Sequence, residues 1–265
     1  MSTAYVVTWD DSPSSALSGL YVQKVRRRMV GAVRDQLITV PGRDGGWVYP
    51  ERRGFRQITA ECTLTSPPST RHAAVVSVAD WLAKTGARQL KFNDQPDRYW
   101  LATLTDDPDP DEWRSRATFA LTWTAQPYAY AVSTTSVTVT ALSPGTLSGN
   151  FTAADTIDAY PEVTITPLDG TMTAIDFTLN DSLLSWAGSL ASGVPINLSS
   201  VSDTVTTGVS TDAELTGAYT PGLVNMADVS GEFGMILEGF NTWAIDWTGT
   251  ATTARIRFRW RRRYR

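Results

Sequence analysis

The position of the basic residues constrains this chain more than any other feature, because it divides the sequence into three parts. Residues 1–130 hold 16 lysines and arginines against 14 aspartates and glutamates, whereas residues 131–254 hold none against 13. Residues 255–265 then hold seven arginines and no acidic residue. A break of this kind marks a domain boundary near residue 130, so the sequence predicts two domains, residues 1–130 and residues 131–265.

The remaining composition excludes several classes of protein. A chain of 265 residues with 42% hydrophobic residues and ten tryptophans has enough apolar area for a large core, so it is not disordered. Cys62 and His72 are the single cysteine and histidine, which excludes an intramolecular disulfide, a cysteine zinc site and a multi-histidine metal centre. We therefore expect neither a cofactor nor a metal.

The sequence contains no targeting pattern and no membrane-spanning pattern. Residues 1–15 lack both a basic start and an apolar run, so we expect no secretory signal and synthesis in a cytoplasm. The longest apolar segment, residues 73–83, is shorter than the ~18 to 20 residues that a membrane helix needs, and it contains Asp80. We expect no membrane insertion.

Alternation of side chains with a period of two predicts strands in residues 1–130. Tyr5, Val7 and Trp9 alternate in this way, and residues 58–64 do so again, as expected of half-buried strands. The longest alternating run extends from Trp113 to residue 123 and predicts one continuous strand.

One segment of this half changes to a helical period. Apolar residues recur at helical spacing between Ser69, a candidate N-cap, and Gly86, which predicts one amphipathic helix over about residues 69–85. Turn-forming residues at 93–97 then separate two apolar runs within residues 90–104, which predicts a hairpin. The N-terminal domain is therefore expected to be an α+β domain, an antiparallel β-sandwich with one helix.

Residues 131–265 are expected to contain strands alone. Short alternating runs such as residues 175–179 and 245–247 lie between turn signals, a spacing typical of an antiparallel β-sandwich. In the final strand, Ile256, Phe258 and Trp260 share one face while arginines occupy the other, so the apolar face is expected to anchor the strand. The whole chain is thus predicted to be mainly β.

No arrangement of residues indicates catalysis. There is no GxSxG elbow, no P-loop and no GxGxxG opening a helix. The acidic run at residues 106–112 is interrupted by Pro108 and Pro110 and lacks the glycine of a calcium loop, so we interpret it as a hairpin tip. A hydrolase with two close carboxylates stays open as an alternative, but we expect that the protein is not an enzyme.

Several motifs resemble one family, the distal tail protein of bacteriophages with long, non-contractile tails. The first half carries them at residues 37–45 (LITVPGRDG), 56–64, 81–82, 90–99 (LKFNDQPDRY), 119–123 (FALTW) and 126–128 (QPY). The second half carries them at residues 160–165 (YPEVTI), 233–241 (FGMILEGFN) and in the arginine-rich end. The sequence departs from the family pattern at Gln126, often aspartate, and at Glu238, often proline.

The resemblance implies a structural role in a virion tail. It implies a homohexameric ring formed by the N-terminal domains, with C-terminal galectin-like β-sandwiches projecting outward. The ring would connect the tail tube protein to the tail-associated tip protein of the host-attachment apparatus, with the tape-measure protein as a further candidate partner. DNA would pass through its channel during ejection without specific binding.

A glycine-rich loop is the candidate subunit and partner interface. It consists of Pro41, Gly42, Arg43, Asp44 and Gly45, all within a segment of little periodicity. Such a loop suits ordering against a neighbouring subunit, while a surface hairpin loop is the alternative interpretation.

A different class of function also fits the sequence. In this alternative, the chain is a carbohydrate-binding module that recognises glycans of the host cell wall, and Trp186 and Trp243 are the candidate sugar-stacking residues. We interpret both tryptophans as core residues in preference to sugar-stacking residues. A galectin-like fold does not by itself bring sugar binding, because function depends on the residues placed on a fold.

Overall fold

The computed structural model confirms a mainly β fold in which α1 is the one α-helix within the described residues. Its sheets are built from antiparallel strand pairs. The chain divides into two compact units, Met1–Val132 and Ser133–Tyr264. The structure describes residues 5–28, 33–34, 37–39, 46–48, 52–106, 108, 111–113, 116–142, 147–154, 157–208, 222–223 and 229–264.

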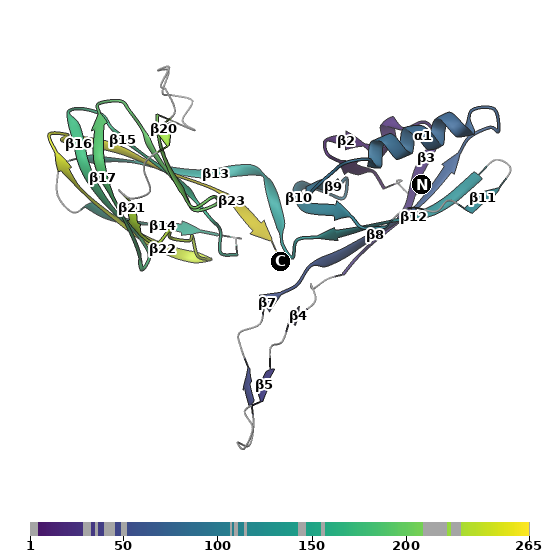
Figure 1. Cartoon of the computed structure of the whole chain (residues 1–265), viewed down its shortest axis with the longest axis horizontal. Coiled ribbons are helices and arrows are strands. Elements are labelled where there is room, and N and C mark those ends of the chain that lie inside the picture. The colour runs from purple at the N-terminus through teal and green to yellow at the C-terminus, as the bar shows by residue number, and fades with distance from the viewer. Residues whose placement is uncertain are drawn as a thin grey trace. The chain divides into compact units, whose positions relative to one another are not determined.

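The first unit is built around a sheet in which β8 and β12 are the longest paired strands (Figure 1). They align over ten residues each, from Arg56 opposite Ala125 to Thr65 opposite Arg116. The strands of this sheet are β1 (Val7–Trp9), β2 (Ser12–Pro13), β3 (Leu20–Arg27), β8 (Arg56–Thr65), β9 (Arg88–Phe92), β10 (Gln95–Leu104), β11 (Asp111–Trp113) and β12 (Arg116–Ala125). A short 3-10 helix, η1 (Ser14–Ala16), follows β2.

Period-two alternation along β8 and β12 produces the core of this unit. Ile58 and Leu121 are fully buried, and the ring centroids of Trp9 and Trp123 lie 6.0 Å apart. Burial of each such side chain contributes about 1.5–3 kcal/mol to the stability of the folded state. The strands predicted at residues 58–64 and 90–104 are therefore confirmed as β8 and as the β9–β10 hairpin.

The single strand predicted from Trp113 to residue 123 is wrong. Trp113 belongs to β11, which runs antiparallel to β12 and places Trp113 opposite Arg116. The turn brings residues three positions apart opposite each other, so the period-two pattern changes phase at this reversal, and the alternation of residue types in the sequence did not reveal that change.

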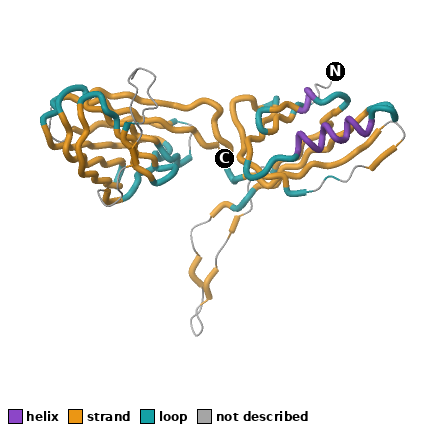
Figure 2. Tube along the Cα trace, turned by 45° about the horizontal axis from the view of Figure 1, so that its top comes forward, coloured by secondary structure: helices purple, strands orange, loops and turns teal. Residues whose placement is uncertain are grey.

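Helix α1 (Arg71–Leu82) packs one side on the strands of this unit, as Figure 2 shows. Val78, Trp81 and Leu82 are buried, and Trp81 Nε1 donates a hydrogen bond to the carbonyl of Ser12 at 2.9 Å. The helix is shorter than the predicted residues 69–85. It ends because Ala83, with a ψ of 62°, leaves the helical region of backbone conformation.

A β-ribbon, here called the arm, is inserted between two paired strands. The arm consists of residues 28–55, which connect β3 to β8 (Figure 1). It contains two ladders, β4 with β7 and β5 with β6. Its strands are β4 (Val33–Arg34), β5 (Leu37–Thr39), β6 (Gly46–Val48) and β7 (Arg52–Arg53).

The second unit is a sandwich of two antiparallel sheets. One sheet has the order β13-β23-β15-β18-β19-β20 and the other β14-β22-β16-β17-β21 (Figure 1). Their strands are β13 (Ala129–Leu142), which begins in the first unit, β14 (Leu147–Ala153), β15 (Glu162–Pro167), β16 (Thr171–Leu179), β17 (Ser182–Ala191), β18 (Ile196–Ser199), β19 (Thr204–Thr207), β20 (Gly222–Leu223), β21 (Val229–Gly231), β22 (Gly239–Gly249) and β23 (Thr253–Tyr264).

Aromatic side chains join the two sheets of the sandwich. The ring of Phe258 on β23 lies 5.1 Å from Phe151 on β14, 5.9 Å from Phe177 on β16 and 5.7 Å from Trp243 on β22, measured between ring centroids. Phe258 is fully buried. The apolar face predicted for the final strand is therefore confirmed, and it lies at the centre of the sandwich.

Candidate assembly surfaces

The predicted interface loop falls outside the residues that the structure describes. Pro41, Gly42, Arg43, Asp44 and Gly45 occur between β5 and β6. The two flanking strands are described, and their register places Thr39 opposite Gly46. The role of these five residues in an interface therefore remains a prediction.

The two candidate sugar-stacking tryptophans belong to the core of the second unit. Trp186 on β17 is 5% exposed and Trp243 on β22 is 4% exposed, and both lie in the same buried cluster as Phe258. Stacking on a sugar requires an open ring face. The structure thus places Trp186 and Trp243 among core residues, because the alternation of their strands turns them inward.

A polar groove crosses the outer face of the second sheet of the sandwich. Its volume is about 400 Å³, and the edge of Trp243 reaches it beside Gly149, which has no side chain to cover the indole. Hydroxyl and amide groups from three strands dominate the lining. The lining residues are Ser148, Gly149, Asn150, Thr178, Asn180, Thr242, Trp243 and Ala244.

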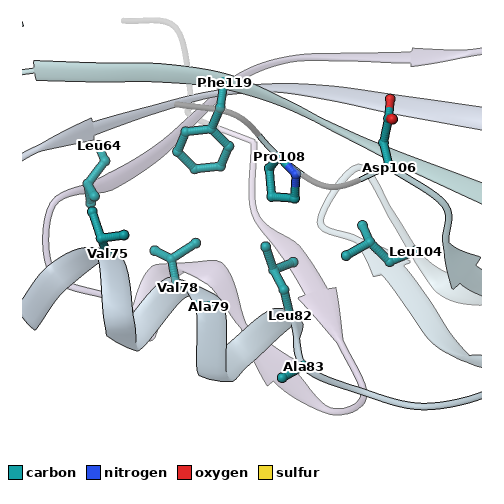
Figure 3. A pocket seen from close by; sticks show the side chains of 10 residues that line it. All are labelled: Leu64, Val75, Val78, Ala79, Leu82, Ala83, Leu104, Asp106, Pro108 and Phe119. Carbon is teal, nitrogen blue, oxygen red and sulfur yellow. The ribbon is translucent and has the colours of Figure 1, made fainter. Parts of the chain in front are cut away.

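A second, apolar cavity lies in the first unit between α1 and the sheet, with a volume of about 290 Å³. Figure 3 shows Val75, Val78 and Leu82 of the helix facing Leu64 and the ring of Phe119. Asp106 supplies the one charged side chain of the lining. The full lining is Leu64, Val75, Val78, Ala79, Leu82, Ala83, Leu104, Asp106, Pro108 and Phe119.

The arginines of β23 lie against polar groups of the neighbouring strands. Arg259 Nη1 is 3.9 Å from Glu162 Oε2 on β15, and Arg262 Nε donates to Thr135 Oγ1 on β13 at 3.3 Å. Thr164, opposite Arg257, is only 3% exposed. Long arginine stems cover the polar face of a sheet in this way while their charged ends reach solvent or an acceptor.

The described residues contain no group of three or more histidine, cysteine, aspartate or glutamate side chains that is able to hold a metal ion. His72 is exposed at the start of α1, and burial raises the pKa of the Cys62 thiol to about 12. A thiol with this pKa is not a nucleophile at neutral pH. The expectations of no catalytic residue and no cofactor remain predictions. Within the described part of the chain, no helix is long and apolar enough to span a membrane.

Two features of these surfaces were missed in the sequence. The polar groove draws its residues from β14, β16 and β22, and no local pattern joins serine, asparagine and threonine residues so far apart. The arginines on both sides of the arm were not recognised as a cluster, although Arg26-Arg27-Arg28 and Arg52-Arg53 are visible in the sequence. The pairing of β3 with β8 places Arg27 opposite Ile58, so the end of β3 lies beside the start of β8.

Comparison with known structures identifies the fold. The SPP1 Dit protein, described as a paradigm of the hub adsorption apparatus in phages that infect Gram-positive bacteria, matches with a TM-score of 0.71 and 15% identity, over 99% of this chain and 100% of that chain. Chains of the phage p2 baseplate in its activated conformation match with TM-scores of 0.48 with strontium and 0.47 with calcium. Their identities are 9% and 10%, covering 97% and 98% of this chain and the same shares of those chains. No protein-family model and no curated protein matches the sequence. The likeness to SPP1 Dit shows a common fold along the whole chain.

Proposed function

We propose that this chain is a structural distal tail protein of a bacteriophage with a long, non-contractile tail. Six copies form a ring that connects the tail tube to the tail-tip apparatus for host adsorption, and its channel lets DNA pass. The partners are further copies of the chain, the tail tube protein and the tail-associated tip protein, with the tape-measure protein as an additional contact. The site of action is the virion tail.

One observation carries this proposal, namely the fold shared with SPP1 Dit over 99% of this chain and all of that chain. The correspondence includes both units, so it does not rest on a common domain alone. A fold does not determine a function. The order of the sequence motifs along both halves of the chain gives independent support, because it depends on the residues and not on the fold.

The arm also suits a subunit of an assembly. Its two ladders are short, with two residue pairs between β4 and β7 and three between β5 and β6. An isolated two-stranded ribbon is marginally stable in water, and open strand edges readily pair with another chain. Packing against a neighbouring subunit therefore stabilises such an arm.

The first experiment measures the mass of the purified chain by light scattering on a sizing column over a range of concentrations. A mass near six chains, with rings in negative-stain images, supports the proposal. The same column run with the tail tube protein tests the connection to the tube. A chain that stays monomeric both alone and with the tube protein contradicts the ring.

The interface loop is tested by deleting Arg43–Gly46. We expect a folded monomer with a nearly unchanged circular dichroism spectrum, because the deletion removes three residues between β5 and β6 and the first residue of β6, all of them outside either core. An unchanged hexamer contradicts the role of the loop and leaves the ring itself in place.

A second candidate function is glycan binding by the second unit. The groove of about 400 Å³ favours it, since hydroxyl and amide groups suit sugar hydroxyls. It predicts glycan binding that Asn150→Ala weakens, whereas Thr248→Ala, an exposed residue on β22 outside the groove, leaves it unchanged. A glycan array with no signal for the unaltered protein contradicts this function.

A further inference from the structure

We propose that the polar groove of the second unit binds a linear glycan without anionic groups, and that the ring of Phe240 is the platform on which one sugar of this glycan stacks. The inference rests on the second candidate function and deepens it, because it names the class of glycan and the residue that orients it. Phe240 takes the place of Trp186 and Trp243, whose rings are buried.

Phe240 lies in line with the groove on β22. The register of β14 with β22 places Phe240 opposite Thr152, and it places Thr242 opposite Asn150. Residues two positions apart on a strand point to the same face of the sheet, and at about 3.4 Å per residue they are about 7 Å apart. The ring of Phe240 therefore continues the groove at one end, beyond Thr242.

The ring of Phe240 is open to solvent. Phe240 is 63% exposed, more than any other aromatic residue described in the second unit. Tyr160 follows at 48%, and the guanidinium carbon of Arg263 lies 5.6 Å from the centroid of its ring. An open aromatic ring offers a flat apolar surface, and the C–H groups on one face of a sugar ring are apolar as well. Phe240 is thus suited to stacking on a sugar.

A buried asparagine fixes the backbone beside Phe240. Asn241 is fully buried, and its Oδ1 accepts a hydrogen bond from the amide of Leu237 at 2.7 Å. Its Nδ2 donates to the carbonyls of Leu237 and Gly239, each at 3.0 Å. Asn180 Nδ2 in turn donates to Asn241 Oδ1 at 3.1 Å. The platform is therefore held in place before a ligand arrives, which reduces the entropic cost of binding.

The groove presents polar side chains that are available to a ligand. Four of the lining side chains form no hydrogen bond within the described part of the chain. They are Ser148, Asn150, Thr178 and Thr242. Hydroxyl and amide side chains both donate and accept hydrogen bonds, as sugar hydroxyls do. Ala244 lies between Ser148 and Thr178 in the register of the three strands, and its small side chain leaves space for the ligand.

The charge of this face disfavours an anionic ligand. The five strands of the sheet lie within residues 131–254, which contain no lysine or arginine. At the end of the groove away from Phe240, Asp176 on β16 lies directly opposite Asp246 on β22, and both residues are exposed. Like charges repel, so these carboxylates disfavour phosphate, sulfate and uronate groups. A nucleic acid or an anionic polymer therefore fits less well than an uncharged glycan.

The length of this surface indicates a chain of sugars. Phe240 and Asp246 are six residues apart on β22, which is about 20 Å at about 3.4 Å per residue. A single sugar ring covers only part of this length, whereas a linear oligosaccharide that lies along β22 reaches both the platform and the polar groups.

The test starts from a glycan array that holds linear, branched, neutral and anionic glycans, probed with the full-length chain. The linear neutral glycan with the strongest signal is then titrated by calorimetry, together with its monosaccharide and its carboxymethylated form. Phe240→Ala removes the platform and Phe240→Trp retains a flat ring. Tyr160→Ala, an exposed aromatic residue outside the groove, is the matched control. Circular dichroism checks the fold of each variant.

We expect a linear neutral glycan to bind the unaltered chain, and Phe240→Ala to weaken this binding about tenfold or more, as expected for the loss of an aromatic anchor. Phe240→Trp and Tyr160→Ala are expected to bind as the unaltered chain does. The monosaccharide is expected to bind less tightly than the oligosaccharide.

The charge selectivity has a test of its own. The carboxymethylated glycan is expected to bind about tenfold less tightly than the neutral glycan, because the carboxylates of the sheet repel it. The double variant Asp176→Asn with Asp246→Asn is expected to narrow this difference and to leave the affinity for the neutral glycan unchanged.

Different results overturn the inference and the proposals on which it rests. An array without a linear neutral glycan overturns both the inference and the candidate function of glycan binding, but it leaves the ring, which the sizing column tests separately. Binding that Asn150→Ala weakens and Phe240→Ala leaves unchanged overturns the inference and retains the groove as a glycan site. Equal affinity for the neutral and the carboxymethylated glycan, or for the glycan and its monosaccharide, also overturns it.

Discussion

The two arginine-rich regions of the molecule accommodate closely spaced positive charges in different ways. On β23 the arginines occupy every second position from Arg255 to Arg261, alternating with buried Ile256, Phe258 and Trp260. Where the arm joins the sheet they come in consecutive runs at the end of β3 and around β7. The difference shows that the spacing of arginines along a strand decides whether all of their side chains can lie on the same face of the sheet.

Period-two spacing keeps every charge on one face. The arginines of β23 therefore meet the hydroxyls and the carboxylate of β15, and the opposite face is free to form the core. Consecutive arginines cannot share a face. Arg27 is forced against aromatic rings, with its guanidinium carbon 4.7 Å from the centroid of Phe92 and 5.9 Å from that of Trp100. Asp94 forms an ion pair with Arg27 there.

The largest expected effect is a loss of stability on removal of an aromatic ring from the apolar face of β23. Phe258→Ala removes the ring that contacts three aromatic residues of the opposite sheet. We expect the second unit to lose about 3–5 kcal/mol of stability to urea, measured by tryptophan fluorescence. The control is Phe240→Ala, because Phe240 is 63% exposed and its loss is expected to change stability by less than about 0.5 kcal/mol.

The next effect is a gain of stability, and it concerns a buried arginine at the start of β8. Arg56→Met replaces a side chain whose Nε and Nη2 are buried without a hydrogen-bond partner with an apolar side chain of similar length. We expect the dilute, unassociated chain to gain about 1–4 kcal/mol of stability, the range seen when buried ionic groups are replaced by apolar ones. Thermal and urea unfolding measure it, with the exposed Arg28→Met as control. A loss of stability would show that the Arg56 charge is compensated within one copy.

A smaller effect concerns the start of β23 and depends on pH. The Thr252 hydroxyl and the Thr253 amide donate hydrogen bonds to Asp169 and lower its pKa to about 2. Since the folded state lowers this pKa, the carboxylate contributes stability above the unfolded value of 3.8. That contribution is lost as the pH falls from about 4 toward 2.

We therefore expect Asp169→Asn to flatten the pH dependence of urea unfolding of the second unit in this window. The exposed Asp181→Asn is the matched control and is expected to retain the dependence. If both variants respond to pH alike, the hydrogen bonds to Asp169 do not stabilise the folded state.

The smallest effect belongs to a paired arginine near the end of β3. The Arg26 and Glu61 side chains are 63% and 41% exposed, so solvent screens their 2.6 Å contact. A double-mutant cycle with Arg26→Ala and Glu61→Ala is expected to give a coupling of about 0.2–1 kcal/mol that decreases with added salt. A coupling that exceeds this range and resists salt would mean that the pair is shielded from solvent.

Much of the fold follows from local patterns. The alternation at Ile58, the apolar face of Phe258 and the helical spacing around Val78 each reflect contacts on one face of one element, so each was predicted correctly. The reversal between Trp113 and Arg116 was missed, since the residue types continue to alternate along the sequence although the strand pairing changes phase there.

The candidate functional residues also differ in how much of their role could be predicted from local sequence patterns. Residues 41–45 were identified by turn chemistry alone, and their role still awaits a test. For Trp186 and Trp243 the core was the preferred interpretation, and a sugar-binding surface stayed open because an aromatic side chain suits either role. The packing of one sheet on another places both in the core.

The sequence by itself determined the mainly β class, the apolar and charged faces of the last strand, and the charge contrast between the halves. These properties depend on residue types and spacings of a few positions, which are local. Only the tertiary structure decided that Nε and Nη2 of Arg56 are buried without a hydrogen-bond partner and that a polar groove joins three strands. Each of these depends on strand register, and register is fixed by contacts between residues far apart in the chain.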